Sequence, residues 1–459
     1  MRSLVSFIFL LAVSTRSSSA QDVVADPLVH TIDVNANQDQ NSNHPSDSTV
    51  PPMPNMDMPG MNMSATPDWQ PSPHNSSGTG WQPAATPDRM WMKSLGTWDL
   101  MAHGVIFADY NQQGGPRGAG KAESVNWLML MEQHKLGRGS ILFREMFSAE
   151  SLTAPHPGFP ELFQTGETYH GQALVDHQHP HNVFSELSFD YTVPITLAAK
   201  EKLSWEFYGA AAGEPALGPV AFMHRASASE LPMAPLSHHL QDSTHTSFGV
   251  ITTGLQITRI KIEGSVFNGR EPDEKRYSLQ FAPLDSWSAR LSVAPTRNWT
   301  AQYSYGRLEH PEALEPGSQR RQTASVEYAR ALPGSWKGSW ATSLIWGRVH
   351  KEADNHNLNG YLLETTVSFK SRNYAFSRVE LVDKDELFPN NPSQPSFRIG
   401  AYTFGGAHDI VQTYLWQLAA GADLTFYSKP GALDPIYGQN PVSFQIFLRL
   451  RPALSHRDH

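Results

Sequence analysis

Short segments with alternating apolar and polar residues fill the C-terminal two-thirds of the chain. In residues 361–370 the odd-numbered positions carry mostly apolar side chains, and the even-numbered positions carry mostly polar ones. Residues 298–305 and 186–193 alternate in the same way. Successive side chains of a β-strand point to opposite faces, so each segment predicts a strand with one apolar and one polar face.

Two architectures accommodate such strands, a transmembrane β-barrel and a secreted β-sandwich. The apolar faces are rich in Trp, Tyr and Phe, and segments of about 10 residues suit a lipid-facing wall with aromatic girdles. The polar faces suit a wet lumen, whereas in a sandwich core each polar group would need a hydrogen-bond partner. The pattern therefore predicts an all-β protein, a transmembrane antiparallel up-and-down β-barrel.

Sixteen candidate strands can be placed from Thr97 onward, with fourteen as the alternative because Gly405-Gly406 fits either a bulge or a turn. Their predicted starts are Thr97, Ser124, Ser140, Val183, Leu203, Thr246, Ile260, Trp287, Trp299, Gln322, Trp336, Asn359, Tyr374, Phe397, Trp416 and Ser443. Short connections such as Thr258-Arg259 alternate with long polar ones. An even count places both termini on the periplasmic side, with short turns there and long loops at the cell surface.

The phase of the alternation assigns each side chain to lipid or lumen. In the segment from Tyr361, Val367 is expected to face lipid and Glu364 the lumen. We therefore expect Glu364→Leu to be tolerated better than Val367→Arg, since charge near the membrane midplane costs about 2–4 kcal/mol.

The N-terminus has the parts of a secretory signal. Arg2 supplies positive charge, an apolar run extends from Leu4 to Val13, and small residues precede a cleavage point after Ala20. The apolar run is far shorter than the roughly 20 residues that a spanning helix needs. Residues 1–20 are therefore expected to be a signal peptide.

The remaining chain divides near residue 90. Residues 21–90 are rich in Asn, Ser, Asp, Pro and Met and have few large apolar residues, which predicts a disordered periplasmic tail. Residues 91–459 are expected to form the barrel, with long loops at 151–182 and 213–245. Connections of this length are usually functional or disordered, and we expect them either to fold into the lumen or to cap it.

Composition narrows the class of partner. The formal net charge is −9 and no Lys/Arg run follows a phosphate backbone, so nucleic acid is not an expected partner. The absence of cysteine excludes disulfides, thiolate metal sites and a cysteine-linked lipid anchor. The alternating last segment, Val442 to Arg451, is typical of a closing strand. The expected location is the outer membrane of a Gram-negative cell, with its lipid and its barrel-assembly machinery as partners.

Five methionines lie within eleven residues of the N-terminal tail. They are Met53, Met56, Met58, Met61 and Met63. Thioether sulfur is a soft ligand that suits Cu(I), and a flexible chain can wrap several such side chains around one ion. A low-complexity linker, or a short segment that binds a partner, is the alternative interpretation.

This layout resembles the copper-resistance protein B family of bacterial outer-membrane barrels. The match is carried by Asn55 to Met63, although the family's tails carry many Met-Asp-His units and this tail has Met56-Asp57-Met58, with His44 and His74 apart. The resemblance is one of tail composition and layout, and transfers no barrel residue. It implies a bound copper ion and a role in copper binding or efflux-linked tolerance.

Histidine is concentrated in the two long loops. Nine of the twenty histidines lie between His156 and His245, most densely in Asp176-His177-Gln178-His179-Pro180-His181. Alternate residues of an extended segment share one side, so His177, His179 and His181 are expected to converge on one ion. Asp176 would supply an oxygen ligand or orient an imidazole. Imidazole suits Zn, Cu or Ni. A loop with solvated histidines is the alternative.

Three functions follow from these features. The first is an outer-membrane barrel that binds or helps move a soft metal ion, copper, in metal tolerance. The second is a general diffusion porin for small solutes with no metal role. The third is an outer-membrane hydrolase, for which Ser237-His238 and Ser243-Thr244-His245 offer the residue types. No Gly-x-Ser-x-Gly, P-loop or dinucleotide motif occurs in a matching context, so an enzyme is not expected.

Overall fold

The structure of the protein is a computed structural model that describes residues 67–154, 156–196, 202–315, 317–391 and 395–454. All of them fall within one of the chain's two compact units, Met63–His459. The predicted signal peptide and the methionines of the tail, Met53 to Met63, lie outside the described residues. No helix among the described residues is both long enough and apolar enough to cross a membrane.

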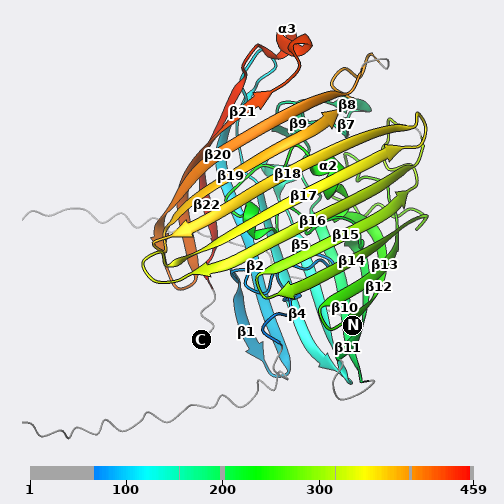
Figure 1. Cartoon of the computed structure of the whole chain (residues 1–459), viewed down its shortest axis with the longest axis vertical. Coiled ribbons are helices and arrows are strands. Elements are labelled where there is room, and N and C mark those ends of the chain that lie inside the picture. Colours follow the sequence, from blue (N-terminus) through cyan, green and yellow to red (C-terminus); the bar gives the residue numbers. More distant parts are fainter. Residues whose placement is uncertain (1–66, 155, 197–201, 316, 392–394, 455–459) are drawn as a thin grey trace, which may run out of the picture. The chain divides into compact units, whose positions relative to one another are not determined.

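Sixteen antiparallel strands form a closed barrel (Figure 1), and two short strands, β1 and β3, complete an 18-stranded sheet. The wall strands are β2 (Trp98–Gln112), β4 (Asn126–Leu136), β5 (Gly139–Phe147), β10 (Phe184–Thr196), β11 (Lys202–Gly213), β12 (Ser247–Ile257), β13 (Ile260–Phe267), β14 (Ser286–Thr296), β15 (Trp299–Leu308), β16 (Gln319–Leu332), β17 (Gly338–Lys351), β18 (His356–Phe369), β19 (Asn373–Lys384), β20 (Phe397–Gln412), β21 (Trp416–Ser428) and β22 (Val442–Pro452). Each predicted start lies within three residues of an observed one.

The first and last wall strands close the ring over only part of their length. β2 pairs with β22 from Ile106 to Gln112. Below that stretch, β2 pairs with β1 (Trp91–Leu95), beginning at Trp91 opposite Ala102. The indole of Trp91 donates a hydrogen bond to the Leu415 carbonyl, at the start of β21. β1 therefore extends the wall where β22 ends. β3 (Gly120–Glu123) pairs with the other end of β2.

The predicted alternation is confirmed along the wall. In β18, Tyr361 and Leu363 are 42% and 47% exposed on the outer face, whereas the intervening Leu362 is buried. Outward-facing apolar side chains are what a wall in contact with lipid requires. The fourteen-strand alternative is wrong, because β20 and β21 are separate strands joined by residues 413–415, and Gly405-Gly406 lies within β20.

Residues 67–90, which the sequence assigns to the tail, pack inside the barrel. Ser77 Oγ donates to Glu214 Oε2 over 2.6 Å, and the backbone N–H of Gly78 donates to Glu186 Oε1 over 3.1 Å. Lys261 Nζ donates to the Thr79 carbonyl over 2.6 Å. Residues 67–90 lie outside helices and strands, so their backbone N–H and C=O groups need other partners, and Glu186 and Lys261 satisfy two of them.

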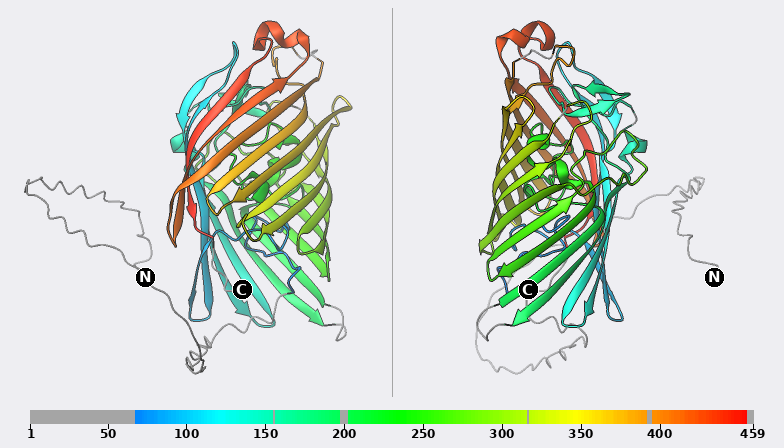
Figure 2. Two further views of the ribbon diagram at one scale, coloured as in Figure 1. Left: turned by 60° about the vertical axis from the view of Figure 1, so that its left-hand side comes forward. Right: turned by 90° about the vertical axis from the view of Figure 1, so that its right-hand side faces the viewer.

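The two long connections also fold against the inside of the barrel. Figure 1 places α2 (His238–Gln241) within the ring, and Figure 2 shows chain inside the wall in both views. The connection over residues 148–183 contains α1 (Glu150–Thr153), β6 (Phe159–Pro160), β7 (Glu167–Tyr169), β8 (Gln172–Leu174) and β9 (His177–Gln178). That over residues 214–246 contains η1 (Ala226–Ala228), α2 and η2 (Ser243–His245). The connection between β21 and β22 contains η3 (Gly431–Leu433) and α3 (Asp434–Tyr437).

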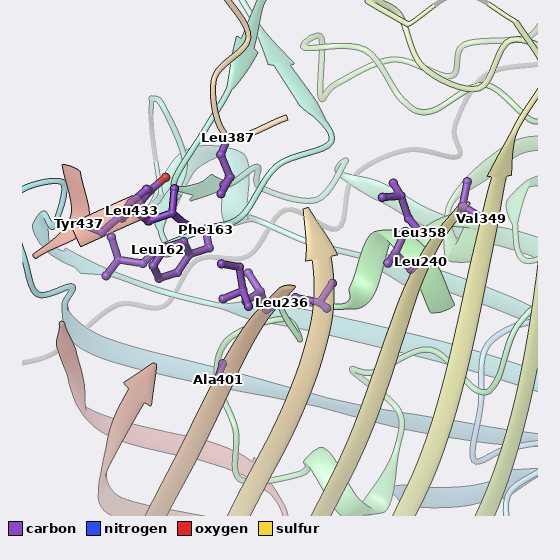
Figure 3. Close-up of a cluster of buried hydrophobic side chains, with 12 residues drawn as sticks. Leu162, Phe163, Leu236, Leu240, Val349, Leu358, Leu387, Ala401, Leu433 and Tyr437 are labelled. Carbon is purple, nitrogen blue, oxygen red and sulfur yellow. The ribbon is translucent and has the colours of Figure 1, made fainter. Parts of the chain in front are cut away.

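An apolar cluster holds these loops to each other and to the wall (Figure 3). Phe163 of the first loop, together with Leu236 and Leu240 of the second, belongs to a buried cluster with Val349 and Leu358 of the wall. Lumen-facing hydrophobic side chains therefore provide loop contacts at this end of the barrel. The capping alternative alone does not describe the second loop, since α2 contacts β16, β17 and β18.

Candidate functional site

Two arginines fix the second loop in the lumen. Arg225 Nη1 lies 2.7 Å from Asp242 of the same loop, and Arg225 Nε lies 2.6 Å from Glu364 on β18. Arg449 of β22 forms ion pairs with Glu230 of the loop and, over 2.5 Å, with Asp409 of β20. All these side chains are at most 1% exposed. Removing one partner would leave an uncompensated buried charge, so these pairs hold the loop in place.

A pair of glycines lets α2 approach the wall closely. Gly347 on β17 is paired with Gly360 on β18, opposite the helix. A Cβ added at Gly347 would lie 2.0 Å from the Leu240 carbonyl oxygen, and one at Gly360 would lie 3.1 Å from the Ser237 Cβ. Because neither position has a side chain, α2 can pack directly against the backbone of β17 and β18.

Five histidines of the two long loops lie close together, and two of them belong to α2. The five are His179, His181, His238, His239 and His245, and their neighbouring ring centroids lie 5.0–6.5 Å apart. The ring of Phe222 packs against three of them. Burial lowers the pKa of His239 to about 4, opposed by Glu167, and burial also lowers the pKa values of His238 and His245. Neutral imidazole is the form that binds metal.

Four of the five rings are already held by hydrogen bonds, and one of them is His179, whose Nδ1 lies 2.8 Å from the Pro180 carbonyl. His181 Nδ1 lies 2.7 Å from Glu150, and its Nε2 lies 3.1 Å from Nε2 of His245. His245 Nδ1 donates to the Asp242 carbonyl over 2.8 Å, so its Nε2 must accept from His181. His238 Nδ1 lies 2.6 Å from the Asp242 carboxylate. These rings form a polar network between the loops.

His179 and His239 flank a pair of carboxylates. One ligand atom each from Glu167, His239 and Glu271 lies within 4.8 Å of the others, as a metal ion would require. His179 Nε2 contacts the same Glu167 Oε1 that lies 3.4 Å from His239 Nε2. Neither nitrogen of His239 has a hydrogen-bond partner among the described residues. We call Glu167, His179, His239 and Glu271 the histidine–carboxylate set.

Two arginines lie beside this set. Arg276 Nη2 is 3.6 Å from Glu167, and Arg321 Nη2 is 3.6 Å from Glu271. These cations balance the carboxylates as the structure stands. A divalent cation bound between Glu167 and Glu271 would neutralise part of their negative charge in place of the two arginines. Imidazole with carboxylate suits Zn or Cu among the first-row metals.

The predicted residues Asp176, His177, His179 and His181 do not converge on one point. Asp176 lies 2.6 Å from Arg117 and accepts a 2.7 Å hydrogen bond from the backbone N–H of Phe163. His177 Nδ1 lies 3.2 Å from the Val175 carbonyl. β9 ends at Gln178, so the three histidines do not lie on one paired strand. Only His179 and His181 join the histidine cluster.

Sequence reasoning missed Glu167, His239 and Glu271. They belong to three different loop segments, and no spacing rule connects such positions. The signal that was available was the adjacent pair His238-His239 in a loop that was expected to fold inward. The serines proposed for a hydrolase have other contacts: Ser237 Oγ donates to Glu380 over 2.7 Å, and Arg321 donates to Ser243 Oγ.

Comparisons of the chain with known proteins found similarity among solved structures alone. No family model and no curated protein matches it. Among solved structures, it is similar to an anion-selective porin from Comamonas acidovorans, with 9% identity, a TM-score of 0.48, and coverage of 77% of this chain and 99% of the porin. The outer-membrane channel DcaP of Acinetobacter baumannii gives 9% identity, a TM-score of 0.45, and coverage of 78% and 98%.

A third structure, OmpF of Salmonella typhi in complex with daunomycin, gives 6% identity, a TM-score of 0.47, and coverage of 79% of this chain and 100% of that one. At such identities, function has to be argued from the side chains of this chain. The resemblance to the copper-resistance protein B family remains one of tail composition and layout.

Proposed function

We propose that the protein is a channel of narrow bore in the outer membrane of a Gram-negative cell, which admits small hydrophilic solutes or ions. The closed barrel with an outward apolar face supports a location in lipid, and the predicted signal peptide supports export. The observation that carries the proposal is the second loop, held inside the barrel by Arg225 and Arg449. A loop fixed by buried ion pairs narrows the lumen permanently, so large solutes are excluded.

Planar-bilayer conductance tests this proposal. Wild-type protein should give small, steady conductance steps. Arg225→Gln removes the positive charge between Asp242 and Glu364, which should release the loop and raise the conductance severalfold. Arg398→Gln is the matched control, because Arg398 pairs with Asp383 but is 51% exposed and distant from the loop contacts described above. Wild-type conductance as large as that of the released variant would contradict the narrow bore.

A second function is favoured by the histidine–carboxylate set. On this alternative the barrel binds a transition-metal ion, copper among them, and contributes to metal tolerance. The supporting observation is His239, whose ring nitrogens lie 3.4 Å from Glu167 and 3.7 Å from Glu271 and make no hydrogen bond among the described residues. Equilibrium binding of Zn²⁺ and Cu²⁺ to the purified chain tests it. His239→Gln should weaken binding, while His170→Gln, at an exposed loop position, should leave it unchanged. If His239→Gln and His170→Gln bind metal equally well, this second function is wrong and the channel without a metal role remains.

A further inference from the structure

Methionine is gathered in one place on the inner wall. Beyond residue 63 the chain has eight methionines. Six of them belong to a single buried cluster, in which Met90, Met101, Met129, Met131 and Met146 pack with Leu142, and Met223 and Trp127 pack against them. Five of these side chains are at most 4% exposed. The lumenal positions that surround the cluster include charged residues such as Arg144 and Arg225, so this is a local concentration of sulfur in a polar lumen.

The strand register explains why these side chains meet. His103 of β2 is paired with Met129 of β4, and Met129 is paired with Met146 of β5. Residues directly opposite on neighbouring strands point to the same face with their Cβ atoms about 4.5–5.5 Å apart. One row across three strands therefore carries an imidazole and two thioethers. Met101 and Met131 form a parallel row one step away.

The imidazole and the thioether are already in contact in this row. His103 Nε2 lies 3.2 Å from the Met129 sulfur. His103 and Met129 are 7% and 0% exposed. A thioether is a weak hydrogen-bond acceptor, so Met129 satisfies the ring poorly compared with a carbonyl or carboxylate.

The second loop places another thioether and another imidazole opposite the row. The ring of His224 lies 5.6 Å from that of His103 and 4.7 Å from that of Trp127, centroid to centroid. His224 is 8% exposed, and neither of its ring nitrogens has a hydrogen-bond partner among the described residues. His103, Trp127, Met223 and His224 line one cavity of about 110 Å³ together with Arg89, Arg225 and Arg451, whereas Met129 and Met146 lie outside its lining. The unpartnered imidazole therefore faces a space that is large enough for an ion.

We infer that His103, Met129, Met146, Met223 and His224 form a binding site for a soft monovalent cation, Cu(I) or Ag(I). Thioether sulfur prefers such ions, and neutral imidazole nitrogen completes a mixed sulfur and nitrogen set without adding negative charge. No carboxylate belongs to this group, which disfavours Ca²⁺, Mg²⁺ and other hard cations. The flexible methionine side chains can close on an ion without a change in the wall.

An apolar packing cluster would have a different composition. Leu and Ile fill a core with well-defined rotamers, whereas methionine specifies packing poorly. An apolar cluster also has no use for two imidazoles, because a buried ring nitrogen without a partner is destabilising. A bound cation would be a partner for a ring nitrogen of His224. It would also replace the weak contact between His103 and Met129. The site goes beyond the channel proposal and does not depend on it.

The test is binding of Ag(I), and of Cu(I) under anaerobic reducing conditions, to the purified full-length protein. All five methionines of the tail, Met53 to Met63, are replaced by Ser in the parent, so that thioethers outside the barrel do not contribute. We expect this parent protein still to bind one Ag(I) or Cu(I) ion tightly. Loss of even an outer-shell partner of a metal weakens binding about 10–100-fold, so Met129→Leu combined with His224→Gln should weaken it at least that much.

Two matched measurements keep this test decisive. Met92→Leu combined with Met233→Leu changes two methionines outside the cluster and should leave binding unchanged. X-ray absorption of the bound Cu(I) should show both sulfur and nitrogen neighbours, and only the cluster variant should lose them. Met→Leu substitutions conserve volume and are well tolerated, and conductance of each variant reports the channel separately. Absence of a tight equivalent in the parent, or equal binding by the cluster variant, would overturn the inference.

Discussion

The wall and the lumen of this barrel are built by different kinds of interaction. The wall repeats one local rule, in which neighbouring strands pair and alternate side chains face lipid. The lumen is filled by residues 67–90 and by the loop over residues 214–246, which are held by contacts between residues far apart in sequence. Arg225 and Glu364 are separated by 139 positions. The wall is therefore fixed by many equivalent pairings, whereas the interior depends on a few charged groups.

The largest expected effect comes from Glu364, where the structure reverses the order expected from the alternation. Its carboxylate is buried and contacts Arg225 over 2.6 Å and Arg378 over 3.1 Å. Glu364→Leu leaves two buried arginines without this partner, and breaking a buried pair costs about 3–5 kcal/mol. Val367→Arg, on the lipid face, should cost about 2–4 kcal/mol. Denaturant unfolding from lipid vesicles measures both.

A double variant sharpens this result. Arg225→Leu combined with Glu364→Leu removes both charges of one pair, so it should recover part of the stability that Glu364→Leu loses. If Glu364→Leu were no less stable than wild type, the lumen would be as tolerant as the alternation alone suggests, and the distinction between wall and interior would fail.

The next largest effect is expected at Gly347, where a substitution should move the second loop without opening the barrel wall. A Val side chain there would collide with the Leu240 carbonyl, because even its Cβ would lie 2.0 Å from that oxygen. Gly347→Val should displace α2 and raise conductance, while the pairing of β17 with β18 keeps the barrel closed. Gly264→Ala is the control, since its Cβ would lie 3.7 Å from the Ser288 carbonyl oxygen, an ordinary van der Waals contact. Heat-modifiable migration reports the barrel, and conductance reports the loop.

The same division explains what sequence could predict. Strand starts, faces and the even count follow from alternation and from turn residues, because these signals are local and repeated. The histidine–carboxylate set could not be predicted, since Glu167, His239 and Glu271 meet only after three loops have folded. The inner methionine row was also missed. Its members occupy lumenal positions in separate strands, and the register that joins His103, Met129 and Met146 becomes known only with the pairing.

A smaller effect concerns the docking of residues 67–90. Burial raises the pKa of Glu214 to about 8, while Arg290 and the hydrogen bond from Ser77 oppose the rise, and Glu186 and Asp242 add to it. The docked carboxyl therefore keeps its proton across a range, from about 4.5 to about 8, in which a free one has lost it. The docked state binds more protons there, so docking is favoured at low pH and weakens as pH rises.

Limited proteolysis between pH 6 and pH 9 measures this docking. Cleavage within residues 67–90 should increase as the pH rises toward 8 and change little beyond it. Glu214→Gln removes the titrating group and keeps a hydrogen-bond acceptor for Ser77, so its cleavage should depend much less on pH. A wild-type profile that is flat, or that rises toward acid, would show that Glu214 does not control the segment.

The smallest effect is expected where an ion pair lies on the outside. Arg398 of β20 contacts Asp383 of β19 over 2.5 Å, but the Arg398 side chain is 51% exposed. Exposed pairs of this kind contribute about 0–1 kcal/mol, because solvent and salt screen the charges. Arg398→Gln should therefore change unfolding stability by less than about 1 kcal/mol, and should leave conductance unaltered. The same substitution at Arg225, with a fully buried side chain that pairs with two carboxylates, removes an equal charge, so the two variants compare a buried ion-pair network with an exposed pair. A stability loss at Arg398 equal to that at Arg225 would mean that charge, wherever it lies, stabilises this barrel, and that the interior has no special dependence on its ion pairs.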